Sequence, residues 1–380
     1  MKAWSFSRTS LRVHWGDGSA ERLAGELDRV GSVRPMAVCT PSVARDNDLL
    51  SRVERCTRRG FADVLTDVRP HSPVEMVQAV AGRLQAADAI VVIGGGSAMV
   101  TARAANILCC EEGELEALAT RRDAGGGLVS PRLTRPKLPM MVLATTPTTA
   151  APKAGAAVTR PESTSRLALF DPATRARCVI VDPELTAGAP DTVARDAALN
   201  ALVMALEGMT TRRRNLYADA ALSHAVRQLP GRIVALAKQR DDPAVRVELT
   251  LLALLSGEGT DSTGGGLTAA LSHSVGHRVH VHNGLVDSIL LPHVLRLASR
   301  RDPSALTSVG ELLGVAPVDV ADAVEELLAP LSPTRRLREI GVAESDVPLF
   351  ADSAMDDFAS RGTTFPLHER DLEQVLEEAL

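Results

Sequence analysis

The stretch AIVVIGGGSAMVTARAA, residues 89–105, decides the fold class of this chain of 380 residues. Residues 89–93 form an unbroken apolar run, which is typical of a strand buried on both faces of a parallel sheet. Gly94, Gly95 and Gly96 follow as a tight turn, and Ser97 then opens an alanine-rich helical segment. A strand, a glycine turn and a helix in this order predict the βαβ units of an α/β protein.

The glycine turn is also a candidate phosphate site. Glycines let the backbone approach a ligand closely, and the N–H groups at the start of a helix attract a pyrophosphate. The turn is not a GxGxxG fingerprint, because Met99 stands at the sixth position counted from Gly94. Three consecutive glycines cost backbone entropy on folding, so we favour a phosphate site over a tight turn without a ligand.

The rest of the first half repeats this alternation. Further strands are expected at residues 34–40, 61–65, 138–144 and 178–181, and helices at residues 49–57 and 72–86. Ser72 is the expected N-cap of the second of these helices, since a proline and a glutamate follow it closely. The stretch 121–137 is rich in Gly, Pro and Arg and predicts a surface loop.

The second half has a different character. Long Ala- and Leu-rich segments with helical periodicity occupy residues 193–208, 217–229, 243–255, 267–277 and 286–298. We therefore predict an α/β domain with a Rossmann-like parallel sheet over residues 1–186, and an all-α domain over residues 187–380.

Composition narrows the class of protein. Lys and Arg number 42 against 47 Asp and Glu, and no long basic run occurs, so nucleic acid is not expected as a partner. Five cysteines without CxxC spacing predict reduced thiols rather than disulfides or a zinc site. No apolar stretch approaches the roughly 20 residues of a membrane span, and the first residues lack a signal-peptide core. We expect a soluble cytoplasmic enzyme with no membrane partner.

A threonine-rich turn follows the strand expected at residues 138–144. It contains Thr145, Thr146, Thr148 and Thr149. Ligands of open α/β sheets bind beyond the carboxyl ends of strands, where such hydroxyls can bond a ribose, an amide or a phosphate. The alternative is a turn whose hydroxyls satisfy their own backbone, and the turn taken alone favours that alternative.

Four of the nine histidines stand close together, at positions 273, 277, 280 and 282. His273 and His277 are four residues apart, so on a helix they share a face. Three imidazoles can hold zinc or iron. The alternative is a polar rim in which one histidine transfers a proton, and we favour that interpretation because no acidic residue lies within the cluster.

The order of motifs resembles the iron-containing alcohol dehydrogenase superfamily, most closely its maleylacetate reductase branch. In chain order the motifs are GGGS at 94–97, PTT at 147–149, DPELT at 182–186, ALE at 205–207, HSVG at 273–276 and LLPHV at 290–294. The resemblance covers nearly the whole chain. It implies a dinucleotide-binding α/β domain, a helical domain with the active site in the cleft between the two, and usually a homodimer. It also implies NAD(P)-dependent reduction of a carbonyl compound or oxidation of an alcohol.

The metal-ligand positions depart from the family pattern. In the family, an Asp and a His four residues apart bind the metal from the helix that ends in Ala-Ile-Glu; Asn200 and Met204 match them here. Ala269 and Asn283 match the third and fourth ligands, although His282 is adjacent to the latter. We therefore predict no catalytic metal. Asn at the first position is itself a trait of the maleylacetate reductase branch.

The resemblance also assigns the cofactor contacts. They match Thr40, Gly94, Gly95, Gly96, Ser97, Thr145, Thr148, Thr149 and Leu185. Thr40 ends the second strand, where an acid often binds the adenosine ribose. Without a carboxylate there, a 2′-phosphate is not repelled, so NADPH fits as well as NADH.

Without a metal, side chains must stabilise the alkoxide that forms in the reaction. His273 matches the family histidine near the nicotinamide and is our predicted proton donor; His277 and Asn200 are predicted to hold the substrate or its alkoxide. For Asn200 the alternative is a structural hydrogen bond. The predicted contacts to the small-molecule substrate, possibly carrying a carboxylate, are Lys153, Arg278, His282 and Asn283.

Two alternatives remain open at this point. The family segment Gly-Thr-Gly-Ser-Glu is replaced by AAPKAG at residues 150–155. The chain could therefore be a non-redox enzyme, such as a cyclase, isomerase or lyase, on the scaffold it shares with dehydroquinate synthase. That hypothesis predicts no consumption of NAD(P)H. A binding protein without catalysis is the third hypothesis, and it predicts that His273→Ala has no effect.

Overall fold

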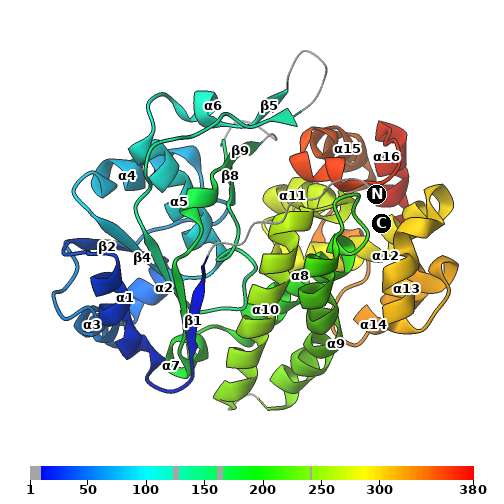
Figure 1. Ribbon diagram of the computed structural model, residues 1–380. Helices are drawn as coiled ribbons and strands as arrows, with labels where there is room; N and C mark the ends of the chain where they lie inside the picture. The colour runs from blue at the N-terminus through cyan, green and yellow to red at the C-terminus, as the bar shows by residue number, and fades with distance from the viewer. Residues whose placement is uncertain (1–9, 123–127, 161–165, 240–241) are drawn as a thin grey trace. The chain divides into compact units, whose positions relative to one another are not determined.

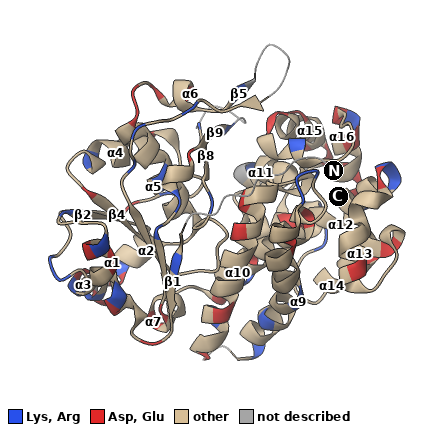
Figure 2. Ribbon diagram, in the orientation of Figure 1, with Lys and Arg blue, Asp and Glu red and all other residues tan. Residues whose placement is uncertain are grey.

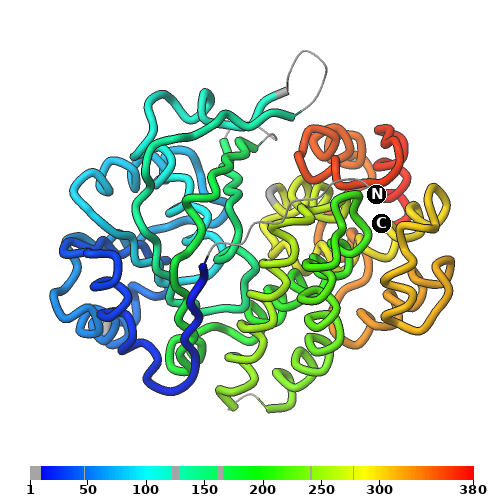
Figure 3. Tube along the Cα trace, in the orientation of Figure 1, coloured from blue at the N-terminus to red at the C-terminus, as the bar shows by residue number. Residues whose placement is uncertain are grey.

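The structure is a computed structural model that describes residues 10–122, 128–160, 166–239 and 242–380 (Figure 1). The chain forms two compact units, Met1–Ala189 and Pro190–Leu380, and Figure 3 traces the backbone through both of them. Charges of both signs are interspersed along the helices (Figure 2).

The first unit is built on a six-stranded parallel sheet with the strand order β1-β10-β7-β4-β2-β3. The strands are β1 (Arg12–Trp15), β2 (Pro35–Cys39), β3 (Asp63–Leu65), β4 (Ala89–Gly94), β7 (Met140–Ala144) and β10 (Cys178–Val181). Every residue of β2, β4, β7 and β10 is buried, as the apolar runs predicted.

Helices connect these strands and cover the sheet. They are α1 (Leu23–Arg29), α2 (Pro41–Arg45), α3 (Asn47–Cys56), α4 (Val74–Leu84), α5 (Gly96–Cys110), α6 (Leu115–Leu118) and α7 (Pro183–Ala187). Leu23 of α1, Val53 of α3 and Leu185 of α7 pack with Val91 and Ile93 of β4 in one apolar cluster. Helices α4 and α5 pack against each other, and α5 also packs on β4. The predicted α/β fold with a parallel sheet is confirmed.

Several elements of the first unit differ from the sequence-based expectation. The stretch 121–137, expected to be a loop, contains the short antiparallel pair β5 (Arg121–Arg122) and β6 (Leu128–Val129). A second antiparallel pair, β8 (Gly155–Thr159) and β9 (Arg166–Phe170), was not expected, and neither was β1. Helix α4 begins at Val74, after Pro73, so Ser72 is not its N-cap. Ser72 Oγ instead accepts a hydrogen bond from Thr101 Oγ1 of α5, at 2.9 Å.

The second unit is helical in all the elements that the described residues form, which confirms the predicted all-α region. Its helices are α8 (Asp191–Gly208), α9 (Leu216–Lys238), α10 (Pro243–Thr263), α11 (Leu267–Val279), α12 (Asn283–Arg301), α13 (Thr307–Leu313), α14 (Val320–Leu328), α15 (Val347–Asp356) and α16 (Glu369–Ala379). Helices α8, α9 and α10 share one apolar core, and α11, α12, α15 and α16 share a second one.

Within the described residues, none of the helices is both long and apolar enough to cross a membrane by itself. The helical segments Pro303–Leu313 and Pro317–Leu328, bent by 85° against each other, reach that length and composition only as a pair.

A buried arginine of α5 fixes residues 150–155, the segment after the threonine turn. The side chain of Arg103 is fully buried. Its Nη2 donates a hydrogen bond to the carbonyl oxygen of Ala150 at 2.6 Å, and its Nη1 donates to that of Gly155 at 2.9 Å. One guanidinium therefore holds both ends of residues 150–155 against α5.

We expect Arg103→Met to lower the free energy of unfolding of the first unit by about 3 kcal/mol, because it leaves two carbonyl groups without their charged donor. Urea unfolding of the full chain measures this loss. The matched control is Arg55→Met, an exposed position on α3, which should change stability by no more than about 0.5 kcal/mol. Equal effects of the two substitutions would contradict this account of Arg103.

Candidate functional site

The glycine turn lies at the carboxyl end of β4. Strand β4 ends at Gly94 and α5 begins at Gly96, one residue earlier than the expected start at Ser97. Gly95 is the N-cap and offers no side-chain acceptor to the helix. The first N–H groups of a helix have no acceptor within it, and the helix dipole makes its start positive. This end of α5 is therefore suited to an anionic group.

The glycine turn and the threonine turn form one structure. The Thr145 N–H donates a hydrogen bond to the Gly94 carbonyl at 3.2 Å. A Cβ atom on Gly95 would lie 2.5 Å from Thr146 Oγ1, and one on Gly96 would lie 3.3 Å from Thr148 Oγ1. A side chain at Gly95 would therefore displace the Thr146 hydroxyl. The bare backbone and the hydroxyls together fit a phosphate that approaches the start of α5.

Thr40 lies beside this turn, at the end of β2. Its Cγ2 would be 3.5 Å from a Cβ atom on Gly94, and its Oγ1 lies 2.9 Å from Ser42 Oγ. Two hydroxyls thus stand at the strand end where an acid often binds a ribose.

Other predicted cofactor residues are less accessible. Thr148 and Thr149 are 8% and 7% exposed, and Thr148 Oγ1 accepts a hydrogen bond from the Ala150 N–H at 3.2 Å. Thr148 thus bonds its own neighbouring backbone, which is the alternative to a ligand contact that the sequence analysis gave for the threonine turn. Leu185 is 1% exposed and packs in the apolar cluster of the sheet. Lys153 follows in the segment that Arg103 holds, and it is partly exposed.

In the second unit, a buried carboxylate fixes the start of α11. Glu207 of the ALE motif is 3% exposed. Its carboxylate accepts hydrogen bonds from the backbone N–H groups of Thr268 at 2.6 Å, Gly266 at 3.1 Å and Ala269 at 3.4 Å. Burial raises the pKa of Glu207, while the three N–H donors act in the opposite direction. Glu207 therefore sets the position of the helix that carries His273.

His273 is paired with a residue that the sequence analysis missed. Its Nδ1 lies 2.9 Å from Asp357 Oδ2, just beyond the end of α15. No local motif marks Asp357 as a partner of His273, since 84 residues separate the two. Arg278 is exposed, and its Nε lies 3.8 Å from Asp346. The side chain of His277 lies outside the described part of the structure.

The four positions that match metal ligands do not offer a metal site. Asn200 Nδ2 donates a hydrogen bond to Asp287 Oδ2 at 2.6 Å, which is the structural role that the sequence left open for it. Met204 and Ala269 lie in the apolar core of α11 and α12, and Asn283 is the first residue of α12. An amide, a thioether and a methyl group are poor substitutes for the Asp and His ligands of iron or zinc.

His282 does not restore that site, because Asp196 engages it. Its Nδ1 lies 3.1 Å from Asp196 Oδ2, and Arg195 donates hydrogen bonds to Asp196 Oδ1 at 2.7 and 2.9 Å. The hydrogen bond with Asp196 raises the pKa of His282 above the ordinary value of 6.5, and burial opposes this only in part.

The described residues contain one group of donor atoms close enough to hold a metal ion, and it lies in the first unit. His14, Glu26 and Cys178 have ligand atoms within 4.8 Å of one another. Burial alone would raise the pKa of Glu26, but hydrogen bonds from Arg12 and His14 outweigh it and lower that pKa. Burial raises the pKa of the Cys178 thiol to about 12. Arg12 and His14 both pair with Glu26, and burial disfavours the Cys178 thiolate that would bind a metal, so the group forms an ion pair in this structure.

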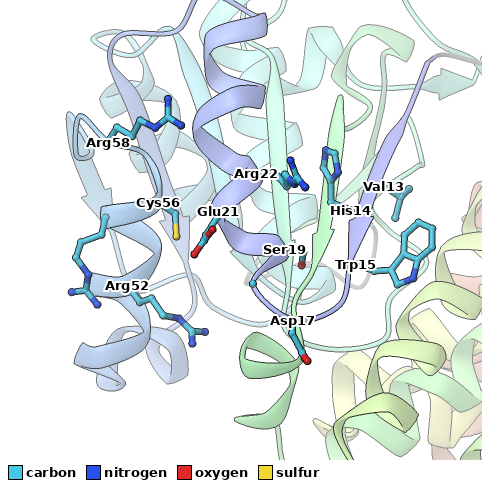
Figure 4. A pocket seen from close by; sticks show the side chains of 12 residues that line it. Val13, His14, Trp15, Asp17, Ser19, Glu21, Arg22, Arg52, Cys56 and Arg58 are labelled. Carbon is cyan, nitrogen blue, oxygen red and sulfur yellow. The ribbon is translucent and has the colours of Figure 1, made fainter.

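A cavity of about 1140 Å³ opens next to His14. It is lined by side chains of β1, the 3-10 turn η1 (Ser19–Arg22) and α3, including Arg22 and Arg52 (Figure 4). The sequence analysis did not find this cavity, because two stretches that are far apart in the chain, residues 13–22 and 52–58, line it.

The chain therefore consists of an α/β unit with a parallel sheet, followed by a helical unit. The family model for iron-containing alcohol dehydrogenases matches residues 10–183, and the model for the C-terminal part of that family matches residues 194–380. The chain belongs to the iron-containing alcohol dehydrogenase family.

Curated relatives match over nearly the full length. Lactaldehyde reductase of Escherichia coli K12 is 25% identical over 376 residues, 96% of this chain and 95% of that protein. Maleylacetate reductase of Rhizobium sp. strain MTP-10005 is 26% identical over 363 residues, 93% of this chain and 92% of that protein. The relatives are named alcohol dehydrogenases and reductases, so the chain is an oxidoreductase that acts on a CH–OH or C=O group.

Solved structures show the same fold. The alcohol dehydrogenase from Oenococcus oeni has a TM-score of 0.87 at 19% identity, covering 98% of this chain and all of that one. Maleylacetate reductase from Agrobacterium tumefaciens has a TM-score of 0.79 at 21% identity, covering all of this chain and 98% of that one.

The pairing of His282 with Asp196 makes a prediction about pH. A histidine whose pKa is raised in the folded state stabilises the protein below pH 6.5, and this contribution is lost as the pH rises through the folded pKa. We expect His282→Gln to lower the free energy of unfolding at pH 6 by up to about 1 kcal/mol, because the histidine is partly exposed, and by less at pH 9.

Urea unfolding at the two pH values measures this difference. The control is His224→Gln, an exposed histidine on α9, which should lower the free energy of unfolding at pH 6 by less than His282→Gln does. A loss for His282→Gln that is the same at both values would contradict the pairing.

Proposed function

We propose that this chain is an NAD(P)H-dependent reductase of a small carbonyl compound, such as a keto acid, and that it works without a bound metal. One observation carries the proposal. The glycine and threonine turns lie together at the start of α5, which would suit a phosphate, while Asn200, Met204, Ala269 and Asn283 stand at the four ligand positions.

The dinucleotide, when bound, supplies a hydride to the carbonyl carbon. The N–H groups at the start of α5 and the hydroxyls of Thr145 and Thr146 would hold its diphosphate. Thr40 would face the adenosine ribose. The remaining predicted contacts to the dinucleotide are Ser97, Thr148, Thr149 and Leu185. Of these four residues, Leu185 has the smallest exposed fraction.

The negative charge that develops on the substrate oxygen needs a donor, since no metal is available to stabilise it. His273 is the proposed proton donor. His277 and Asn200 remain proposed hydrogen-bond donors, and Asn200 already donates to Asp287. Lys153, Arg278, His282 and Asn283 are the proposed substrate contacts. A positively charged side chain among them would receive a carboxylate, as the name of the relatives called maleylacetate reductase supports.

We further propose, from the family resemblance, that the enzyme is a cytoplasmic homodimer; sedimentation equilibrium tests the dimer. A non-redox activity is the second candidate. The segment 150–155 favours it, because Ala151 and Ala154 are fully buried where the family has Gly-Thr-Gly-Ser-Glu. In that case, substrate turnover proceeds without loss of NAD(P)H absorbance.

The main experiment combines two measurements on the purified full chain. Mass spectrometry identifies small molecules released on denaturation, and elemental analysis of the same sample measures metals. We expect NADP(H) or NAD(H) and less than 0.1 equivalent of iron or zinc, together with NAD(P)H oxidation by a panel of keto acids and aldehydes. Stoichiometric iron or zinc would refute metal independence, and turnover of a panel compound without NAD(P)H oxidation would favour the non-redox candidate.

A pair of glycine variants locates the dinucleotide. Gly95→Ala puts a Cβ atom against the Thr146 hydroxyl and should weaken NAD(P)H binding by about tenfold. Gly82→Ala, at an exposed position on α4 with open space around the new atom, should bind NAD(P)H as the wild type does.

Thr40 controls the choice between the two dinucleotides in this proposal. We expect Thr40→Asp to weaken NADPH binding at least tenfold, because a carboxylate repels the 2′-phosphate, and to leave NADH binding unchanged or tighter. Fluorescence titration of each dinucleotide measures the two dissociation constants. Ser51→Asp adds the same charge at an exposed position of α3 and should change neither. Parallel losses for NADPH and NADH in Thr40→Asp would contradict the assignment.

A further inference from the structure

The second unit contains a histidine–aspartate pair that has the geometry of an acid–base dyad. His273 is in the middle of α11. Asp357 is the N-cap of the 3-10 helix η7 (Phe358–Gly362), and η7 packs on α11. The Nδ1 and Oδ2 atoms are 2.9 Å apart. The side chains are 21% and 9% exposed respectively, so the pair is shielded from water but not closed off from it.

We infer that Asp357 is the residue that positions His273 for proton transfer, an assignment that rests on His273 being the proton donor of the proposed function. An ionised carboxylate can only accept hydrogen bonds. Nδ1 of His273 must therefore carry a proton, and Nε2 is the nitrogen that exchanges a proton with the substrate. Asp357 thus fixes both the tautomer and the orientation of the ring, as the carboxylate of a catalytic triad does.

The two oxygens of Asp357 have separate roles, which makes the carboxylate rigid. Oδ1 accepts a hydrogen bond from the Ala359 N–H at 2.8 Å and so caps η7. The Ser360 Oγ donates to the Asp357 carbonyl oxygen at 2.7 Å. Oδ2 is the oxygen directed at His273. A carboxylate held by its own helix cap can orient an imidazole with little loss of side-chain entropy.

The pair also balances charge during the reaction. In reduction, the carbonyl carbon gains a hydride from NAD(P)H, which becomes NAD(P)+, and the carbonyl oxygen takes the proton from Nε2. The ring becomes neutral while Nδ1–H stays bonded to Asp357, and solvent returns a proton to Nε2. A carboxylate beside the ring favours its protonated form, the form that donates. This supplies part of the electrostatic support that a metal gives in other enzymes.

Two variants separate this role from the structural one. Asp357→Asn keeps an oxygen that can cap η7, but it removes the charge next to His273. Asp352→Asn removes the charge of an exposed aspartate on α15 and serves as the control. Other charged or titratable groups on the elements packed against α11 stay unchanged in both variants: Asp356 of α15, Arg361 of η7, and Asp287, His293, Arg296, Arg300 and Arg301 of α12.

NMR spectroscopy of the full chain with 15N-labelled histidine tests the assignment without any substrate. His273→Gln identifies the resonances of His273. We expect neutral His273 to carry its proton on Nδ1 in the wild type, and the midpoint pH of its protonation to fall by about one unit or more in Asp357→Asn. Asp352→Asn should match the wild type. A proton on Nε2 in the neutral wild-type ring, or an unchanged midpoint in Asp357→Asn, would overturn the inference.

A kinetic measurement then separates this inference from the proposed function. With a carbonyl substrate found in the panel, Asp357→Asn should lower kcat by about 10²-fold or more and change KM little, because positioning acts on proton transfer rather than on binding. If no carbonyl compound is reduced, the proposed function fails, and the NMR result still decides whether Asp357 fixes the His273 ring. If reduction occurs and kcat is unchanged in Asp357→Asn, the proposed function survives and this inference fails.

Discussion

The backbone between β4 and α5 must pass beside the threonine turn with no side chain between them, and the arrangement of the α/β unit depends on this constraint. A Cβ atom on Gly95 would meet the Thr146 hydroxyl at 2.5 Å. The sheet order puts β4 between β7 and β2, so Thr145 and Thr40 at the ends of those strands flank the turn. An anionic ligand at this turn would meet N–H groups and hydroxyls, and none of these residues carries a carboxylate. The ligand chemistry follows from where three neighbouring strands end.

In the helical unit, two buried aspartates close to the positions that match metal ligands each accept hydrogen bonds from other side chains. Asp287 and Asp196 are 2% and 6% exposed. An unpaired carboxylate at such depth would cost several kcal/mol. The amide of Asn200 donates to Asp287, and His282 and Arg195 engage the two oxygens of Asp196. Each carboxylate thus accepts a hydrogen bond from a side chain of the protein itself.

The sequence predicted the parts of the molecule that depend on local pattern. Apolar runs marked the buried strands β2, β4, β7 and β10, because a strand covered on both faces needs no polar residue. The strands β1, β8 and β9 were missed, and none of them is buried over its whole length as β2, β4, β7 and β10 are. In the site, strand-end residues such as Gly95 and Thr145 could be found, as chain order fixes where strands end. Asp357 could not: its position before a short helix indicates a cap, and only the tertiary fold brings it to His273.

The ALE motif keeps a buried contact to α11 although the ligand positions on the same helix differ from the family pattern. Hydrogen bonds of buried side chains can hold a helix in place where the positions that match metal ligands carry other residues. Glu207 provides three such bonds to the start of α11, and Asp357 provides one to the ring that α11 carries. On the helix that bears the motif, the ligand positions hold Asn200 and Met204, whereas Glu207 matches the family pattern. The three hydrogen bonds of Glu207 to the start of α11 therefore do not depend on which residues stand at the ligand positions.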